Sequence, residues 1–339
     1  MVPMSARLPV LFLSFGGPDG PDDIMPFLEI VTKGRGIPRE RLLGVAEHYH
    51  HMGGKSPINE ITRRQADALR AEFAAAGDAR EVYIGQRNWG PFIEDALRRM
   101  RDDGVKTAIG YCTAAYRCEA SWERYLNAVE AARATVGADA PVIRFVAPWF
   151  DHPLFIEAIA ARVRETGAPP DATWVFTAHS IPCAMAKDSS YVEELRAAAG
   201  RVAEKLGRKN WILAFTSRSG NPRDAWLEPD VSKVIDAFAQ KGAKDLLVIP
   251  IGFVADHVEV LYDLDVEAKA AADKVGVRLH RAKTVGDHPS FIRMIAELVR
   301  ADAPATPAPS TPPPGSKLTD CRCFPGEPSP PCLRTSPRT

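Results

Sequence analysis

The chain has 339 residues, with 43 basic and 43 acidic side chains and a formal net charge of zero. This balance leaves no bulk positive field of the kind that holds nucleic acid. The mean hydropathy of −0.17 and the 45% hydrophobic content are typical of a globular protein, and no apolar run approaches the roughly 20 residues of a membrane helix.

Short β-branched apolar runs alternate with longer segments of helical periodicity along the chain. The predicted strands are 9–15, 81–85, 106–112, 143–147, 173–178, 211–216, 245–251 and 277–280. The predicted helices are 58–76, 119–135, 153–166, 191–206, 230–242 and 290–300. This alternation favours parallel sheets with helices on both faces.

Both halves of the chain repeat the same coarse pattern, so we expect an α/β fold of two doubly wound, Rossmann-like domains whose parallel sheets face a central cleft. The predicted domains are 8–150 and 151–301, with the catalytic residues in the second. Residues 302–339 are Pro-rich and carry three cysteines, which predicts a disordered linker and tail. Ligands in such folds bind beyond the carboxyl ends of the strands.

The segment 251–267, IGFVADHVEVLYDLDVE, carries three carboxylates at helical spacing. Glu259, Asp263 and Glu267 follow each other at i, i+4 and i+8, and at about 1.5 Å rise per residue they form one acidic row on a helix. Such a row destabilises its helix unless it meets a cation or passes protons. The alternative is a solvated acidic face.

A second segment, TAHSIP, places His179 directly after a predicted strand. Neutral imidazole accepts a proton or binds a metal near neutral pH. The alternative is a histidine that only makes hydrogen bonds at a loop entrance.

These two segments occur in order with several others: SFGGPDGPDD near the start, GGKSPINEIT, QRNWGPFIEDAL, WFDHPLF and TSRSGNPRDAWLEPDV. Across about residues 8–300 this series resembles the ferrochelatases, enzymes that insert Fe2+ into a porphyrin with release of two protons. The resemblance implies a class II chelatase fold and a lyase of heme biosynthesis. It leaves protoporphyrin IX and coproporphyrin III open as substrates.

By this resemblance, His179 and Glu259 are the catalytic pair, on opposite sides of the bound macrocycle. One accepts the pyrrole protons and the other helps to hold Fe2+, and the resemblance does not settle which residue does which. Asp263 and Glu267 continue the carboxylate row as a metal or proton route. Imidazole and carboxylate together make a mixed site for Fe2+, weak enough to release the metal.

The resemblance also implies contacts with the porphyrin. The first loop, with Ser14, Phe15 and Gly16, is expected to lie over the ring. Phe15 stands where some relatives carry a tyrosine, so it cannot ligate the metal. The residues expected to meet propionates or the pocket wall are Lys33, Arg35, Ser56, Gln65 and Arg87. The alternative for the charged residues is that they are ordinary surface residues that do not contact the porphyrin.

Some ferrochelatases hold a [2Fe–2S] cluster on four cysteines. Here Cys118, Cys321, Cys323 and Cys332 match that set in part, although the spacing near the end differs from that in relatives. The alternatives are incidental thiols on a disordered tail, or a zinc site. Cys112 and Cys183 are expected to be buried and neutral. The HYHH run at 48–51 is interpreted as a polar helix end.

Two other functions remain compatible with these motifs. One is a chelatase for another metal or tetrapyrrole; the other is a heme or porphyrin carrier without catalysis. We expect a cytoplasmic monomer with porphyrin as substrate and heme as product, no nucleotide cofactor, no nucleic-acid partner and at most peripheral membrane contact.

Overall fold

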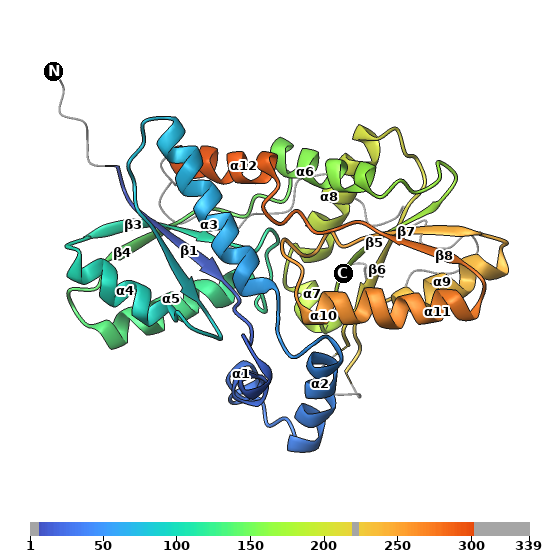
Figure 1. The fold of residues 1–339 in the computed structure, drawn as a ribbon, viewed down its shortest axis with the longest axis horizontal. Helices are drawn as coiled ribbons and strands as arrows, with labels where there is room; N and C mark the ends of the chain where they lie inside the picture. The colour runs from blue at the N-terminus through green and yellow to red at the C-terminus, as the bar shows by residue number, and fades with distance from the viewer. Residues whose placement is uncertain (1–6, 219–223, 302–339) are drawn as a thin grey trace, which may run out of the picture.

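The computed structural model describes residues 7–218 and 224–301 (Figure 1). The expectation of a disordered tail at 302–339 therefore lies outside the described residues. Within the described ranges, no helix is both long enough and apolar enough to cross a lipid bilayer.

The first half of the chain builds a four-stranded parallel sheet in the order β2–β1–β3–β4. Its strands are Val10–Ser14 (β1), Val82–Gln86 (β2), Thr107–Cys112 (β3) and Val142–Phe145 (β4). Its helices are a short 3₁₀ turn, Pro21–Asp23, followed by Ile24–Thr32 (α1), Arg39–His51 (α2), Ile58–Ala75 (α3), Ile93–Asp102 (α4) and Trp122–Val136 (α5). Every residue of β1 is buried, as expected for a central strand covered on both faces.

The second half repeats this arrangement in the order β6–β5–β7–β8. Its strands are Thr173–His179 (β5), Ile212–Thr216 (β6), Asp245–Ile249 (β7) and Arg278–Arg281 (β8). Its α-helices are Pro153–Glu165 (α6), Cys183–Lys187 (α7), Tyr191–Lys205 (α8), Val231–Gln240 (α9), Val258–Leu261 (α10), Lys269–Lys274 (α11) and Pro289–Arg300 (α12). A π-helix, Tyr262–Ala268, joins α10 to α11. The predicted fold of two parallel-sheet α/β units is confirmed, and all eight strands overlap the predicted runs.

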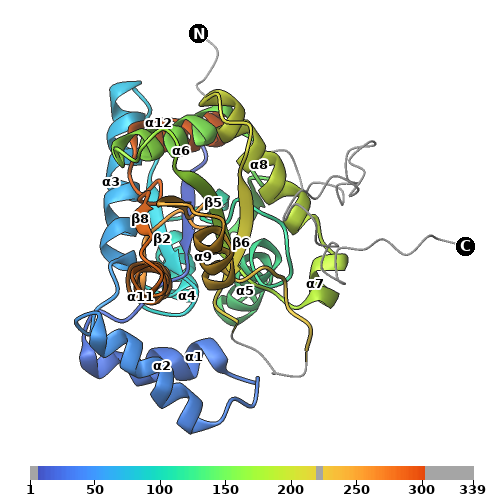
Figure 2. The same ribbon diagram turned by 90° about the vertical axis from the view of Figure 1, so that its right-hand side faces the viewer.

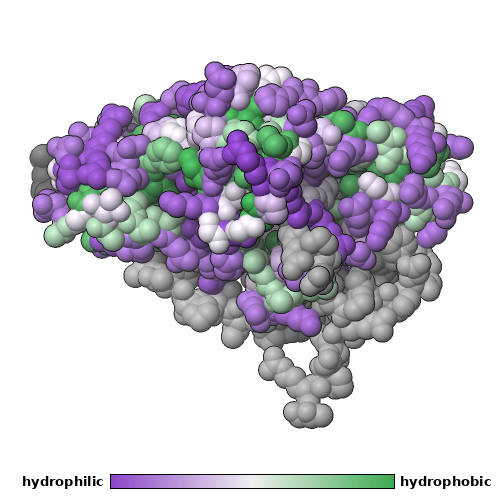
Figure 3. Space-filling view, turned by 90° about the horizontal axis from the view of Figure 1, so that it is seen from below, coloured by the Kyte–Doolittle hydropathy of each residue, from purple (hydrophilic) through white to green (hydrophobic). Residues whose placement is uncertain are grey.

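Three helices of the first half were not predicted: α1, α2 and α4. Helix α1 carries a proline near its start, and α2 is largely polar, so neither shows a clear apolar stripe. In Figures 1 and 2, α1 and α2 project together from the body of the molecule. Figure 3 views this side, where hydrophilic residues dominate the described surface and hydrophobic ones are scattered among them.

The two halves share buried side chains. One continuous apolar cluster includes Phe12 and Tyr111 of the first sheet and Phe176 and Leu213 of the second. Helix α12 packs against both α3 and α6, so the last described helix covers the first half as well (Figure 1). The predicted division at residues 150 and 151 falls between the two sheets but does not separate their cores, and it stays a prediction.

Candidate active site

His179 is the last residue of β5, where the strand ends at the carboxyl edge of the second sheet. Its Nδ1 contacts the carbonyl oxygen of Ser180 at 2.5 Å. Because a carbonyl oxygen only accepts, Nδ1 carries a proton and Nε2 faces away from the strand. The Tyr191 hydroxyl donates to the carbonyl oxygen of His179 at 3.0 Å, which fixes the end of the strand.

Glu259 reaches the same edge from β7 by way of the loop before α10. This loop crosses directly over β5 at Gly252, where an added Cβ would lie 2.6 Å from the Cβ of Ala178. Only glycine permits this approach. The result is an ion pair of 3.3 Å between Nε2 of His179 and Oε1 of Glu259. The structure therefore brings the two predicted residues into contact.

The charges of this pair reinforce each other. Burial alone would lower the pKa of His179, but the charge of Glu259 and its hydrogen bond raise it overall. Burial alone would raise the pKa of Glu259, yet His179, with smaller effects from His257 and His48, lowers it to about 2. The pair is held as imidazolium and carboxylate at neutral pH.

The acidic row begins in an α-helix and continues on a π-helix, whereas its spacing predicts one α-helix: Glu259 lies in α10, and Asp263 and Glu267 lie in the π-helix. Asp263 lies in this turn and accepts a hydrogen bond from the Ser217 hydroxyl. Burial, then the neighbouring charges of Glu259 and Glu267, raise the pKa of Asp263 to about 7. The three carboxylates are thus close enough to influence one another, as a row along the helix requires. Helices of this type are rare and are often found at functional sites.

Two expectations about this site, a macrocycle between the pair and a metal on the acidic row, stay predictions. A macrocycle between His179 and Glu259 would need van der Waals contacts of about 3.5 Å on each of its faces. The 3.3 Å contact leaves no such space, so the pair does not flank opposite sides of a ring in this structure. Within residues 7–218 and 224–301, moreover, no three His, Cys, Asp or Glu side chains are grouped to hold a metal ion. The predicted set His179, Glu259, Asp263 and Glu267 is not a preformed metal site.

Three of the residues expected to contact the porphyrin are instead interior supports. Ser14, Ser56 and Gln65 are each at most 2% exposed. The Ser14 hydroxyl is hydrogen-bonded to the Thr62 hydroxyl at 2.8 Å, and Gln65 Nε2 donates to the carbonyl oxygen of Gly286 at 2.8 Å. Their side chains do not face an open cleft, so we assign them to holding the first loop and the two halves together.

Of the charged residues expected at the pocket wall, two lie on the surface and Arg87 is partly buried. Lys33 and Arg35 are both exposed, after α1. The Arg87 guanidinium lies 4.8 Å from the ring centre of Phe15 and 5.0 Å from that of Tyr125. Gly16 has φ +82°, a left-handed conformation that directs the loop past Trp89.

These arginines form a cationic group with Arg124. Burial, then the charge of Arg124, lowers the pKa of Arg35, while Glu119 raises it. Burial also lowers the pKa of Arg87, with contributions from Arg124 and Arg35. The Nη1 atom of Arg87 is buried without a hydrogen-bond partner among the described residues. Arg124 is itself paired with Glu119 at 2.9 Å. The donor left unused among the described residues is therefore Nη1 of Arg87, which favours an anionic ligand.

Cys112, Cys118 and Cys183 are buried and form no disulfide with one another, and burial was expected for Cys112 and Cys183. Cys118 is 2% exposed, and burial raises its pKa to about 12. Cys321, Cys323 and Cys332 lie outside the described residues, so the structure does not test the proposed four-cysteine set.

Sequence reasoning missed a contact that closes one side of the site. The ring of Tyr262, in the π-helix, stacks on His48 at 3.8 Å between centres and meets the edge of His51 at 5.8 Å. The interpretation of HYHH as a polar helix end is confirmed, since the run ends α2, but it did not include the contact with Tyr262. The spacing i, i+3 of these two histidines, which places them on one helix face, was the available signal.

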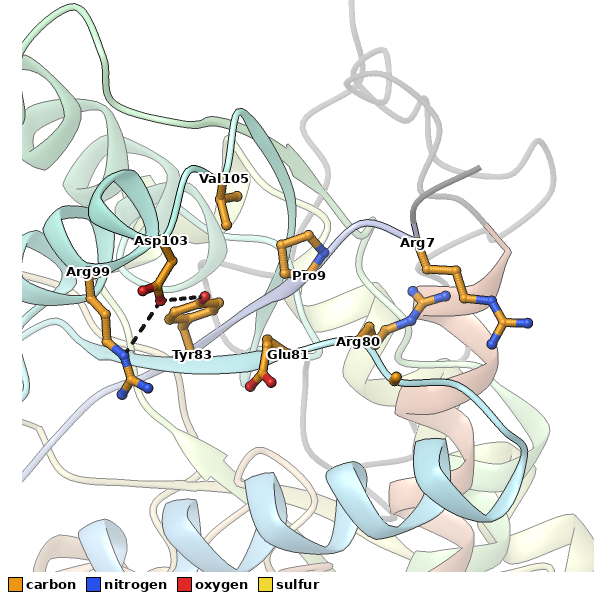
Figure 4. A pocket seen from close by; sticks show the side chains of 9 residues that line it. Arg7, Pro9, Arg80, Glu81, Tyr83, Arg99, Asp103 and Val105 are labelled. Atoms are coloured by element: carbon orange, nitrogen blue, oxygen red, sulfur yellow. Dashed lines mark hydrogen bonds and ion pairs between the residues drawn. The ribbon is translucent and has the colours of Figure 1, made fainter. Parts of the chain in front are cut away.

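A hollow of about 510 Å³ lies elsewhere, at the amino-terminal ends of β1, β2 and β3 (Figure 4). Its charged lining residues are already paired. Arg80 contacts Asp78 at 3.0 Å, and the Tyr83 hydroxyl donates to Asp103 at 2.8 Å. Because α/β sheets bind ligands at the opposite edge, we assign no catalytic role to this hollow.

Comparison with known proteins agrees with this geometry. The family model described as ferrochelatase matches residues 7–303. A Rhodopirellula baltica protein named ferrochelatase is 45% identical over 299 residues, covering 86% of this chain and 84% of that protein. A Mycobacterium avium protein named coproporphyrin III ferrochelatase is 45% identical over 295 residues, covering 86% of each chain.

Solved structures show the same fold at low sequence identity. SirB from Bacillus subtilis, solved with Fe3+, has a TM-score of 0.54 at 11% identity, covering 88% of this chain and 96% of SirB. A multi-domain Deinococcus radiodurans protein described as structurally similar to chelatases has a TM-score of 0.54 at 17% identity, covering 90% of this chain and 56% of that protein. With the family match over nearly all of the described residues, the chain belongs to the ferrochelatase family.

Proposed function

We propose that this protein inserts Fe2+ into a porphyrin in heme biosynthesis, as a lyase that exchanges two pyrrole protons for the metal. The observation that carries the proposal is the ion pair of His179 and Glu259 at the carboxyl edge of the second sheet. Insertion requires a group that takes up protons beside the ring and a route that removes them. The family match and the names of the relatives support the same reaction.

The acidic row supplies the route for protons. Both nitrogens of His179 carry protons in this pair, so the Nε2 proton must first pass to Glu259 across the 3.3 Å contact. The neutral imidazole can then accept a proton from a pyrrole nitrogen. Asp263 comes next along the π-helix, and its pKa of about 7 lets it both hold and release a proton near neutral pH. Glu267 follows it. Fe2+ enters as substrate, and the absence of a preformed three-ligand group among the described residues agrees with a metal that is passed on.

The test is replacement of His179 by alanine. We expect insertion of Fe2+ to fall by at least about 100-fold, because general acid–base groups contribute factors of this size. His280→Ala is the matched control, since His280 is also paired with a carboxylate, Asp245 at 2.9 Å, but lies on β8 away from the site. Near-normal turnover of the His179 variant, with an unchanged circular dichroism spectrum, contradicts the proposal.

We further propose coproporphyrin III as the substrate rather than protoporphyrin IX. Coproporphyrin III carries four carboxylates and protoporphyrin IX two, and Arg35 and Arg87 supply cations that suit the additional carboxylates, whereas Arg124 is already paired with Glu119. Relatives named coproporphyrin III ferrochelatases support this choice. Turnover of both porphyrins side by side is the test. Arg35→Gln should raise KM for coproporphyrin III more than for protoporphyrin IX, and faster wild-type turnover of protoporphyrin IX refutes the choice.

A [2Fe–2S] cluster on Cys118, Cys321, Cys323 and Cys332 is supported by the number of thiols alone. The Cys118 thiol is buried and burial raises its pKa to about 12, so it would lose its proton only on binding iron. No step above involves the cluster. Iron and acid-labile sulfide in anaerobically purified protein support it; an active, colourless, iron-free preparation refutes it.

The predicted cytoplasmic location and monomeric state remain predictions. Cell fractionation tests the first. Sedimentation of the full chain tests the second, and a mass of about twice 37.0 kDa contradicts it.

A further inference from the structure

One guanidinium contacts both ends of the segment that carries Glu259. Arg281 is the last residue of β8 and only 15% of its side chain is exposed. Its Nε donates to Oδ1 of Asp265 at 2.6 Å, and its Nη1 donates to Oδ1 of Asp256 at 3.1 Å. Nη1 also donates to the carbonyl oxygen of Ala282 at 3.3 Å, which fixes the guanidinium against its own strand.

The two aspartates enclose Glu259 and Asp263, the first two residues of the acidic row, in the sequence. Asp256 lies in the loop just before α10, three residues ahead of Glu259. Asp265 lies within the π-helix, two residues after Asp263. Asp256 is partly buried, with 19% of its side chain exposed, and Asp265 is exposed, at 39%. Binding both to Arg281 therefore sets the separation of two points between which Glu259 and Asp263 are placed.

The π-helix needs such support. Its i→i+5 hydrogen bonds fit the chain less well than those of an α-helix, so it persists where tertiary contacts hold it. The apolar contacts come from Leu264 and Ala268, which are buried in the core of the second half. Arg281 is the cation that both Asp256 and Asp265 contact, in a segment where carboxylates otherwise repel one another.

We propose that Arg281 is a positioning residue: it holds the loop before α10 and the π-helix at a fixed separation, so that the carboxylate of Glu259 stays against His179. It does not contact the pair itself. This inference depends on the proposed function for its kinetic consequence, whereas its structural consequence can be measured without any activity.

The test compares Arg281→Met with Arg278→Met in the full-length protein. Arg278 lies on the same strand and makes a two-point ion pair with Asp245, at 2.8 and 2.7 Å, away from the π-helix. In Arg281→Met we expect kcat for iron insertion to fall by about 10- to 100-fold, because a displacement of about 1 Å at a reacting group has effects of this size. KM for the porphyrin should stay within about twofold, and Arg278→Met should leave kcat unchanged.

Hydrogen exchange of the amides of residues 258–268 is the readout that does not need activity. We expect exchange there to become at least about tenfold faster in Arg281→Met and to stay as in the wild type in Arg278→Met. Arg281→Lys keeps the charge but not the two-point contact, and should rescue kcat only in part.

Either of two results overturns the proposal: unchanged exchange in Arg281→Met, or an equal fall of kcat in Arg278→Met. If Arg281→Met does not fold, the double variant Asp256→Asn, Asp265→Asn weakens the same contacts while keeping the arginine, and it must show the same loss of kcat. An inactive wild type would refute the proposed function, while the exchange experiment would still decide the role of Arg281.

Discussion

Replacing Glu194 with glutamine should stabilise the protein at neutral and alkaline pH. Glu194 lies in α8 and is 6% exposed. It accepts hydrogen bonds from the Arg117 amide at 2.7 Å and from the Ser190 hydroxyl at 2.6 Å. Burial nevertheless raises its pKa from 4.5 to about 7, so the folded protein holds the proton that the unfolded chain releases.

The size of the effect follows from these two values. Well below pH 4.5 the Glu194 carboxyl is protonated in both the folded and the unfolded state, so it does not change the free energy of unfolding with pH. Between pH 4.5 and 7 the unfolded chain ionises first, so the free energy of unfolding falls as the pH rises. A difference of roughly 2.5 pH units, at about 1.4 kcal/mol each, gives a loss of about 3 kcal/mol by pH 8. Because glutamine does not titrate, the free energy of unfolding of the variant does not fall in this way.

The assay is urea unfolding of the wild type and Glu194→Gln at pH 5 and pH 8. The advantage of the variant should grow from under about 1 kcal/mol at pH 5 to about 3 kcal/mol at pH 8. Glu204→Gln, exposed on the same helix, is the control and should shift both curves little. An advantage that is the same at both pH values, or a less stable glutamine variant at pH 8, refutes the reasoning.

Three further predictions concern stability at separate places. Gly16→Ala should lower the free energy of unfolding by about 1–2 kcal/mol or more in urea titrations, because φ is +82° and the new Cβ would lie 2.9 Å from the Trp89 backbone nitrogen; an unchanged midpoint contradicts this. Leu264→Ala should cost about 2–5 kcal/mol, since Leu264 is 1% exposed and anchors the π-helix, and a loss under 1 kcal/mol would mean that the site repacks. Arg278 and then His280 lower the pKa of Asp245 from 3.8 to about 2, so the stability they provide is present above pH 3.8 and lost as the pH falls toward 2. The stability of Asp245→Asn should therefore fall less than that of the wild type between pH 3.8 and 2. An identical midpoint of acid unfolding for variant and wild type contradicts this prediction.

The strands were predictable because buried parallel strands leave apolar runs with few alternatives. The run 173–178 became β5, and the expectation that His179 ends a strand followed from it. The π-helix was not predictable, because the spacing of Glu259, Asp263 and Glu267 fits an α-helix equally well. Tertiary contacts with residues distant in the sequence, such as Arg281, distinguish the π-helix from an α-helix here.

The candidate site was predicted at the level of positions but not of roles. Motif resemblance identified Ser14 and Gln65 as important, and the structure places both in the interior, where their partners are Thr62 and the Gly286 carbonyl. A hydroxyl or an amide serves equally as a ligand contact or as an internal hydrogen bond. Burial of the side chain decides whether it contacts a ligand or makes an internal hydrogen bond, and a single sequence does not reveal the burial of a polar side chain.

The position of α12 has a consequence for synthesis of the chain on the ribosome. The last strand of the first sheet ends at Phe145, but the helix that covers α3 ends at Arg300, 155 residues later. At a translation rate of about 5–20 residues per second, the face of α3 around Phe73 stays uncovered for roughly 8–30 seconds before α12 has been synthesised. The nascent first half therefore exposes apolar surface to chaperones or to neighbouring nascent chains until translation has passed residue 300. A chain that ends before α12 should aggregate for the same reason.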